Sequence, residues 1–275
     1  MDIEKFSMYL KEEEKSGNTV EKYTRDVRTW SEWCGKTGTG YCKEDVISYK
    51  NHLIQSGYSK RSINSMLCSV NAYLDYAGLG SCKVKLLKLQ RDVFCDERKE
   101  LTKEEFKRLS IAAMSCGDNR LFMLLQTLCA TGIRVSELPF VTVEAVREGE
   151  TAVTLKGKTR TVFFVRKLRK KLLDYARESG IKTGQIFVTR TGRPMSRTNI
   201  WREMKKLCKK ADVDESKVFP HNLRHLFARV FYELKKDIAK LADILGHSSI
   251  ETTRIYIASS GYEHRRLMEK MRLII

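Results

Sequence analysis

The segment from Phe219 to Tyr256 constrains the fold more than any other part of the sequence, because it combines a helical pattern with an unusual set of side chains. His221 and Arg224 stand three residues apart, so on a helix they share one face. Gly246 suits the left-handed residue that ends a helix, and a new helix carrying Tyr256 then follows. Cationic donors, imidazoles and one phenol together suit a phosphodiester, whose charge must be neutralised while an oxygen attacks it.

Simpler interpretations of the same segment have to be weighed. A single tyrosine or histidine on a helix most often packs or hydrogen-bonds without a catalytic role. His221 and His225, four residues apart, could also form half of a metal site. However, no Glu follows His221 and no cysteine pair lies nearby, so we predict no metal site. We expect Ser248 or Ser249 to cap the helix that carries Tyr256.

The charge balance indicates a polyanionic partner. Lys and Arg number 52 against 34 Asp and Glu, which gives a net charge of +18, and the pI is near 9.6. Nucleic acid is the commonest partner of so basic a protein. A membrane surface is the competing partner, but we find no signal peptide and no apolar run near the ~20 residues that a membrane span requires. We therefore predict no membrane partner.

The eight cysteines contain no Cys-x-x-Cys pair. Several lie at apolar-periodic positions, such as Cys68 beside Leu67. Without an export signal, they are expected to be reduced thiols in a cytoplasmic protein.

The length of 275 residues, with 42% hydrophobic and 31% charged residues, allows two globular domains that each bury a core.

Residues 1–78 predict a small helical domain. An apolar stripe recurs at helical spacing, at Val20, Tyr23, Val27 and Trp30, and we expect Asn18-Thr19 to cap this helix. The opposite face of this helix carries Lys22, Arg25 and Arg28. Lys60 and Arg61 begin a later helix, where cations and helix-end amides together hold phosphates. The alternative is that these charges are simply solvated.

Residues 79–100 carry several charges and little periodicity, so we predict a linker there. A second domain is expected at 101–275. Thr102 and Glu105 form a capping box, and an apolar helix near 121–131, which we expect to end at Gly132, precedes Arg134. Glu137, three residues after Arg134, is placed to hold that guanidinium so that it points into a cleft.

The clearest β signal follows as a hairpin. We predict strands at 151–155 and 160–165, a turn at 156–159 with Gly157 in it, and a third short strand at 185–189. Eight Lys and Arg but no acid lie between residues 156 and 171. We expect Lys158, Arg160 and Arg166 in this patch to lie along a phosphate backbone.

Taken in chain order, these motifs resemble the tyrosine recombinases, also called the phage integrase family. The matching residues are Ala130-Thr-Gly-Ile-Arg134-Val-Ser-Glu137-Leu, the Lys156-Gly-Lys158 hairpin, His221-x-Leu-Arg224-His225, Leu245-Gly-His247-Ser-Ser, and Tyr256 nine residues after His247. The match covers residues 101 to the end, and the N-terminal domain fits by length, place and helix count. The resemblance implies a mainly α fold with a small β-sheet in the second domain: a helical SAM-like core-binding domain followed by a tyrosine-recombinase catalytic domain.

The resemblance also implies six catalytic residues: Arg134, Lys156, His221, Arg224, His247 and Tyr256. Tyr256 would attack the scissile phosphate to form a 3′-phosphotyrosine, and His221 would accept its proton. Two guanidiniums and His247 would bind the phosphate oxygens. Lys156 would protonate the leaving 5′-oxygen; the turn also offers Lys158, and we favour Lys156. Glu137 and His225 would support the site.

The function implied is that of a site-specific recombinase or integrase acting on double-stranded DNA without cofactor, metal or ATP. A relaxing type IB-like topoisomerase and a catalytically silent DNA-binding relative are the alternatives. Family resemblance further implies a homo-tetramer assembled on DNA, with accessory DNA-bending proteins as further partners. We predict that an apolar-striped tail helix at 262–275 docks on a neighbouring protomer, or else folds back on its own domain.

Overall fold

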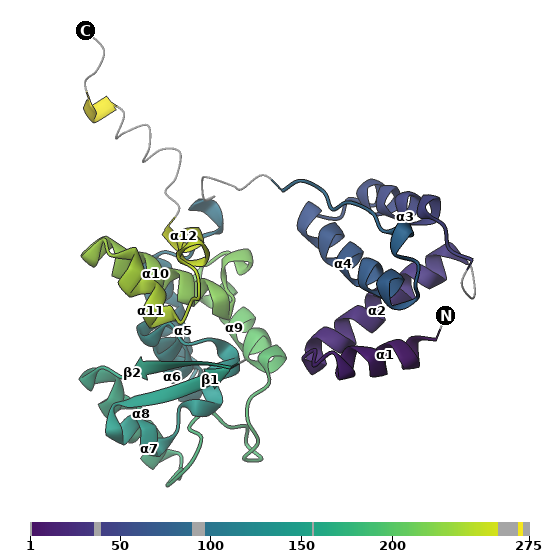
Figure 1. Ribbon diagram of the computed structural model, residues 1–275. Coiled ribbons are helices and arrows are strands. Elements are labelled where there is room, and N and C mark those ends of the chain that lie inside the picture. Colours follow the sequence, from purple (N-terminus) through teal and green to yellow (C-terminus); the bar gives the residue numbers. More distant parts are fainter. Residues whose placement is uncertain (1, 36–39, 90–96, 156, 258–268, 272–275) are drawn as a thin grey trace. The chain divides into compact units, whose positions relative to one another are not determined.

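The computed structural model describes residues 2–35, 40–89, 97–155, 157–257 and 269–271. Lys156 therefore lies outside the described residues, as does the predicted tail helix at 262–275 except for 269–271. The chain divides into two compact units, Met1–Arg91 and Asp92–Ile275 (Figure 1). No helix in the described part of the chain is both long and apolar enough to cross a membrane.

The described residues of the N-terminal unit form four helices and one short 3₁₀ turn. They are α1 (Ile3–Glu12), α2 (Gly17–Cys34), α3 (Lys43–Gln55), α4 (Lys60–Tyr76) and η1 (Gly80–Cys82). The predicted stripe of α2 forms part of its core, and Trp30 is fully buried. The predicted cap was wrong: α2 begins at Gly17 directly after Ser16, whose hydroxyl lies 2.8 Å from Thr19 Oγ1.

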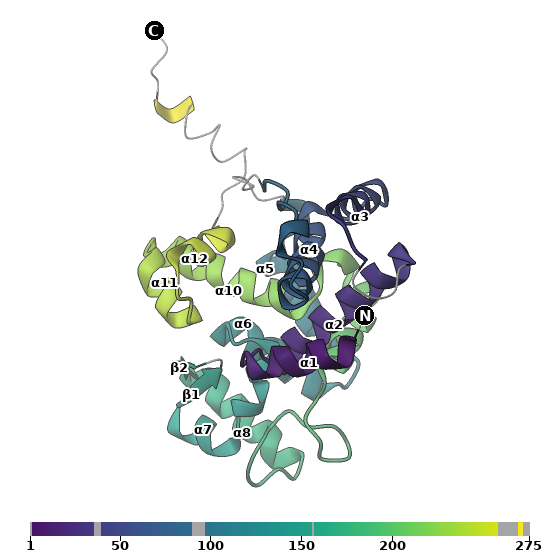
Figure 2. The ribbon, with the colours of Figure 1, turned by 45° about the vertical axis from the view of Figure 1, so that its right-hand side comes forward.

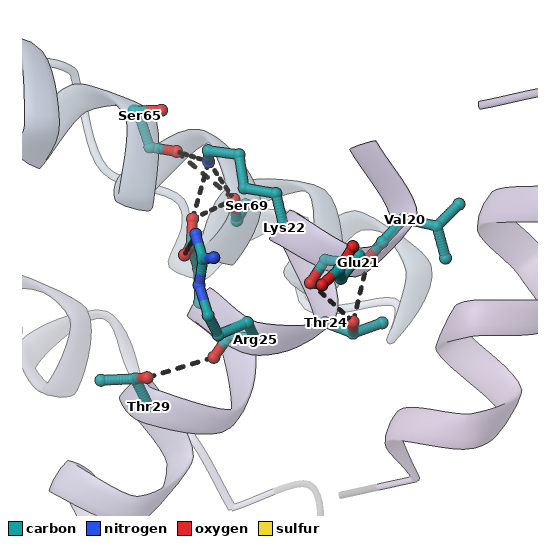
Figure 3. A network of polar contacts seen from close by, with 9 residues as sticks. Val20, Glu21, Lys22, Thr24, Arg25, Thr29, Ser65 and Ser69 are labelled. Atoms are coloured by element: carbon teal, nitrogen blue, oxygen red, sulfur yellow. Dashed lines mark hydrogen bonds and ion pairs between the residues drawn. The ribbon is translucent and has the colours of Figure 1, made fainter. Parts of the chain in front are cut away.

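Lys22 does not lie on a solvated basic face as the sequence suggested. Its ammonium donates to Asp26 Oδ2 at 2.6 Å, and across to α4 it donates to the Ser65 carbonyl at 2.9 Å and to Ser69 Oγ at 3.0 Å (Figure 3). Ser69 Oγ also donates to Asp26 Oδ2 at 2.9 Å. Asp26 is 5% exposed. Lys22 therefore compensates a buried carboxylate and ties α2 to α4.

The segment after α4 is held against that helix. The side-chain amide of Asn71 donates to the Val84 carbonyl and accepts from the Val84 amide, at 3.0 and 3.2 Å. Asn64 makes the same pair of bonds to Leu87, at 2.9 and 2.8 Å. Each Asn reproduces the two hydrogen bonds of a strand partner, so this part of the predicted linker is ordered by α4.

The C-terminal unit is built around the apolar helix α6. Its elements are η2 (Glu97–Lys99), α5 (Lys103–Ser115), α6 (Asn119–Thr131), η3 (Val135–Phe140), α7 (Val143–Glu148), β1 (Glu150–Leu155), β2 (Lys158–Phe163), α8 (Arg166–Glu178), α9 (Arg197–Ala211), η4 (Glu215–Lys217), α10 (Pro220–Lys235), α11 (Ile238–Leu245) and α12 (Ile250–Ile257). The predicted capping box of α5 is present, with Thr102 and Glu105 exchanging both bonds. Leu124, Leu125 and Leu128 of α6 are fully buried. Both ribbon views place α12 beside α10 and α11 (Figure 2).

The sheet is a two-stranded antiparallel hairpin whose pairing runs from Glu150 with Phe163 to Leu155 with Lys158. The predicted four-residue turn was therefore wrong, because Lys158 lies in β2 and only two residues join the strands. Gly157, at φ +71°, occupies that turn. The short connection follows from the backbone twist of paired strands, which favours two-residue turns with positive φ.

The predicted third strand at 185–189 is not a strand. Gln185 and Val188 each form one isolated bridge, to Thr142 and Pro194. Ile186 and Phe187 are consecutive and both buried, so side chains do not alternate between two faces as they do in a ladder. The β-branched and aromatic residues there serve core packing, and the sequence pattern alone does not separate the two cases.

Candidate active site

The ends of two helices carry the site, and each ends at a glycine in the left-handed region. α6 ends at Gly132, with φ +62°, and α11 ends at Gly246, with φ +66°. A side chain at Gly132 would collide with Phe227, and one at Gly246 would collide with Arg160. The chain therefore needs glycine at both points, for conformation and for space. Both helix stops were predicted from the sequence.

Arg224 of α10 is held by the carbonyl groups of those same helix ends. It is 1% exposed. Its Nη1 donates to the Gly132 carbonyl at 2.5 Å, and its Nη2 donates to the Leu245 carbonyl at 2.6 Å. Burial first, and then the charge of Arg134, lowers the pKa of Arg224 to about 10, so it is still a cation at neutral pH.

Glu137 binds two arginines at once. Its Oε1 accepts from Arg134 Nη1 at 2.8 Å, and its Oε2 accepts from the Arg134 amide at 2.9 Å and from Arg160 Nη2 at 2.6 Å. Glu137 is 1% exposed. Burial alone would raise the pKa of its carboxyl, but the Arg134 bonds and the Arg160 guanidinium hold that pKa below the ordinary value. Glu137 thus contacts Arg134, and its supporting role in the site stays a prediction.

Arg160, predicted as a DNA contact, lies mostly inside the domain. Its side chain is 8% exposed, and besides the bond to Glu137 its Nη1 donates to the Ile244 carbonyl at 2.8 Å. Arg160 therefore joins β2 to the end of α11 and to the loop that holds Arg134. Any contact of this side chain with DNA stays a prediction.

Tyr256 of α12 is brought against three histidines. Its Oη lies 3.5 Å from His221 Nε2, at the limit of a hydrogen bond. Its ring centroid lies 4.4 Å from that of His225, 5.4 Å from that of His247 and 5.7 Å from that of His221. Tyr256 is 6% exposed. The segment from Phe219 to Tyr256 thus folds with its imidazoles around its phenol.

Two of these histidines are held neutral. Burial first, and then the charges of His225 and Arg224, lower the pKa of His221 to about 4. Burial first, and then the charges of Arg224 and Arg134, lower the pKa of His247 to about 4. A neutral imidazole has a free lone pair on one nitrogen, so His221 is able to accept the proton of Tyr256 at neutral pH.

Sequence reasoning missed Glu100, which supports His225. His225 Nδ1 lies 3.4 Å from Glu100 Oε1, and Arg229 Nε lies 3.5 Å from Glu100 Oε2. Burial would raise the pKa of Glu100, but the His225 hydrogen bond and the neighbouring cations keep it below the ordinary value. No local pattern links residues 100 and 225, so only the fold reveals the pair.

Thr253 is the other missed residue. Its hydroxyl lies 2.8 Å from His247 Nδ1, and its side chain is fully buried. The spacing of three between Thr253 and Tyr256 does place both on one helix face, which is a signal that could have been used. Ser249 Oγ accepts from the Glu251 amide at 3.2 Å at the start of this helix, as one of the two predicted caps.

Three of the other predicted DNA contacts lie on exposed helix starts. Lys60 and Arg61 occupy the first turn of α4, and Arg166 begins α8; all three are exposed. Lys158 lies in β2, and its side chain is outside the described part of the chain, as is Lys156. Their roles stay predictions.

Among the described residues, no group of three His, Cys, Asp or Glu lies close enough to hold a metal ion.

A SAM-like helical domain, followed by a domain in which a tyrosine faces histidines and arginines, defines the class of tyrosine recombinases. The chain belongs to the phage integrase family: residues 99–262 match the phage integrase family model. Residues 3–78 match the N-terminal SAM-like domain of phage integrases. The recognition made from the sequence motifs and the mainly α fold class are thereby confirmed. As a member of this family, the protein is a site-specific recombinase that transfers DNA strands.

Relatives match over nearly the whole chain. The tyrosine recombinase XerA of Thermococcus kodakarensis is 32% identical, over 99% of this chain and 95% of the relative. A crystal structure of XerA recombinase is 27% identical with a TM-score of 0.55, over 99% of this chain and 98% of the other. A lambda integrase dimer bound to a COC′ core site shares the fold, with a TM-score of 0.72 at 16% identity, over 92% and 93% of the two chains.

Proposed function

We propose that this protein cuts and rejoins double-stranded DNA through a covalent bond between Tyr256 and a 3′-phosphate. The observation that carries the proposal is the position of the Tyr256 hydroxyl, which lies 3.5 Å from His221 Nε2 and interacts with the buried guanidinium of Arg224. A nucleophile, a base and a cation for the developing charge are the groups that phosphoryl transfer requires.

The reaction is written from these groups. Tyr256 Oη attacks the phosphorus and gives its proton to His221 Nε2, while the bond from phosphorus to the 5′-oxygen breaks. A lysine of the β1–β2 turn, by our assignment Lys156, gives a proton to that oxygen, which leaves as a 5′-hydroxyl. Rejoining runs these steps in reverse, so the phosphotyrosine stores the bond and no nucleotide is needed.

Arg134, Arg224 and His247 stabilise the negative charge that builds on the phosphate oxygens during attack. The two guanidiniums are fixed before the substrate arrives, which is the condition under which such contacts lower a barrier most. Arg224 is fixed by main-chain carbonyls and Arg134 by Glu137. Because two guanidiniums supply the positive charge, the proposed chemistry has no step that requires a divalent metal.

The partners we propose are duplex DNA and further copies of this chain. The net charge of +18 suits a polyanion, and lambda integrase and XerH have been seen bound to their DNA sites. Exchange between two duplexes requires four strand cuts, so we propose a tetramer assembled on DNA. Accessory DNA-bending proteins are proposed as further partners. DNA as substrate is in keeping with the cytoplasmic location expected from the sequence.

The test is to trap the covalent complex. The substrates are duplexes from around the gene, each nicked beside a candidate cut so that the 5′-hydroxyl fragment is lost after cleavage. We expect wild-type protein to accumulate the covalent adduct on them, also in excess EDTA. Tyr256→Phe binds the same DNA and gives no adduct that survives denaturation. Tyr232→Phe, a change to a half-buried tyrosine of α10, is the matched control and keeps wild-type adduct. Adduct from Tyr256→Phe would overturn the proposal, and relaxation of any supercoiled DNA without a defined site would favour a topoisomerase.

A further inference from the structure

A buried hydroxyl on the helix of the nucleophile contacts a phosphate-binding histidine. Among the described side chains of α12, Thr253 and Tyr256 are buried, and Thr253 is fully so. Thr253 Oγ1 lies 2.8 Å from His247 Nδ1. On the opposite edge of the same ring, Arg224 Nη2 lies 3.1 Å from His247 Nε2. The imidazole is therefore held between a guanidinium and a hydroxyl.

These two contacts fix where the His247 proton lies in the free protein. A guanidinium has only donors, so Nε2 must accept from Arg224. The ring is neutral at pH 7, because burial and the charges of Arg224 and Arg134 lower the pKa of His247 to about 4. Its single proton is then on Nδ1, and Nδ1–H donates to Thr253 Oγ1. The free site thus holds the Nδ1–H tautomer.

That tautomer is the wrong one for the bound state. In the proposed function His247 donates to a phosphate oxygen. Arg224 binds the same phosphate, and the His247 nitrogen that faces Arg224 is Nε2. Nε2 is therefore the nitrogen that meets the phosphate. A phosphate oxygen accepts hydrogen bonds and does not donate them, so Nε2 must carry the proton when DNA is bound. Nδ1 is then bare, and it needs a donor to remain satisfied in its buried position.

We propose that Thr253 is a positioning residue whose hydroxyl lets His247 exchange tautomers when a phosphate enters the site. Nε2 takes a proton from water, Nδ1 returns one to water, and the ring stays neutral throughout. The Thr253 hydroxyl meanwhile turns from acceptor to donor. A hydroxyl serves both tautomers, whereas a carboxylate in its place would accept only and would hold the proton on Nδ1. This inference rests on the proposed function.

The position of Thr253 in the chain ties this exchange to the nucleophile. It stands one helical turn before Tyr256 on α12, so any movement of that helix would carry the hydroxyl and the phenol together. Without α12, His247 Nδ1 loses the partner that serves it in both states. The donor for the phosphate is therefore set only when the attacking oxygen is present.

Three variants test the role of the hydroxyl in cleavage. Thr253→Val keeps the shape and loses the hydroxyl, Thr253→Ser keeps the hydroxyl, and Thr252→Val makes the same change at an exposed neighbour on the same helix. We expect Thr253→Val to slow single-turnover adduct formation by about 10- to 100-fold, below the ~100- to 1,000-fold that follows loss of a whole oxyanion donor. Single-site DNA binding stays unchanged, and Thr253→Ser and Thr252→Val cleave at close to the wild-type rate. Wild-type cleavage by Thr253→Val would overturn the proposal.

A direct measurement keeps the proposal testable even if Thr253→Val is poorly folded. The ¹⁵N shifts of the His247 ring nitrogens are recorded in Tyr256→Phe, free and bound to an uncut duplex site, and are assigned by their loss in a further His247→Asn change. The proposal requires Nδ1–H in the free protein and Nε2–H in the complex. The same tautomer in both states, or a ring with both protons in the complex, overturns it. Failure of the proposed function would show separately, as wild-type protein that forms no adduct.

Discussion

Replacing Glu137 by Gln tests whether one buried carboxylate organises the arginines of the site. Gln keeps the shape of Glu but loses its charge, and its amide group places N–H donors against guanidinium N–H donors. Arg160, only 8% exposed, then has no anion. It retains the bond to the Ile244 carbonyl, which limits the loss.

The expected loss can be estimated from the burial of each partner. Breaking a buried ion pair by neutralising one partner costs about 3–5 kcal/mol. Arg134 is 38% exposed, so water screens its share, and we take the lower end, about 3 kcal/mol. For a unit the size of Asp92–Ile275, about 1 kcal/mol shifts the melting temperature by roughly 2–4 °C, so the variant should melt roughly 6–12 °C lower.

The loss should also depend on pH in one direction. The folded pKa of Glu137 is lowered, so its contribution to stability is complete above the unfolded value of about 4.3 and declines as the pH falls through the folded value. Because Gln does not titrate, the difference in stability between Glu137→Gln and wild type should become smaller below about pH 4.

Thermal unfolding at neutral and acid pH, followed by single-turnover cleavage, measures these effects. Asp174→Asn is the matched control, because it removes one carboxylate from an exposed pair with Arg177 and should cost no more than about 1 kcal/mol. We expect Glu137→Gln to lower cleavage more than DNA binding. The reasoning is refuted if Glu137→Gln and Asp174→Asn have the same melting temperature. It is also refuted if the difference in melting temperature between Glu137→Gln and wild type is the same at both pH values.

Two further predictions concern other parts of the chain. Lys22→Met leaves Asp26 buried without its ammonium. Because Lys22 is 32% exposed, we take the lower end of the range for a broken buried pair, about 3 kcal/mol in urea unfolding. Lys11→Met on α1 should have little effect, and equal losses in the two variants would contradict this role of Lys22. A 5′-bridging phosphorothiolate, whose leaving group needs no proton, should restore cleavage to Lys156→Ala and not to Lys158→Ala, and the reverse pattern would assign the acid to Lys158.

Local signals in the sequence were enough to predict much of the helical framework. Gly132 and Gly246 end their helices as expected, and Thr102 with Glu105 caps α5, because each of these features depends on residues within one turn. The hairpin was predicted, but its turn was placed too wide. A propensity pattern does not tell whether Lys158 belongs to the turn or pairs with Leu155.

What the sequence could not show is which side chains meet across distant elements. Lys22 was placed on the face opposite the apolar stripe, because the position of a residue on a helix does not reveal that Ser69, 47 residues later, contacts it. Arg160 was treated as a surface cation for the same reason. The support of His225 by Glu100 joins residues 125 positions apart and follows only from the packing of α10 against the start of the domain.

The arginines of the site have a consequence for how the protein survives without its substrate. Three guanidiniums of the described site, those of Arg134, Arg160 and Arg224, lie close enough to repel one another. Glu137 binds the first two and main-chain carbonyls bind the third, so these four residues carry a surplus of two positive charges. Repulsion among these cations in a region shielded from water opposes folding until an anion arrives. Arg134 and Arg224, which the proposed chemistry uses, thus also weaken the empty protein. Selection for heat resistance in the absence of DNA should remove one of these arginines before it alters the apolar core.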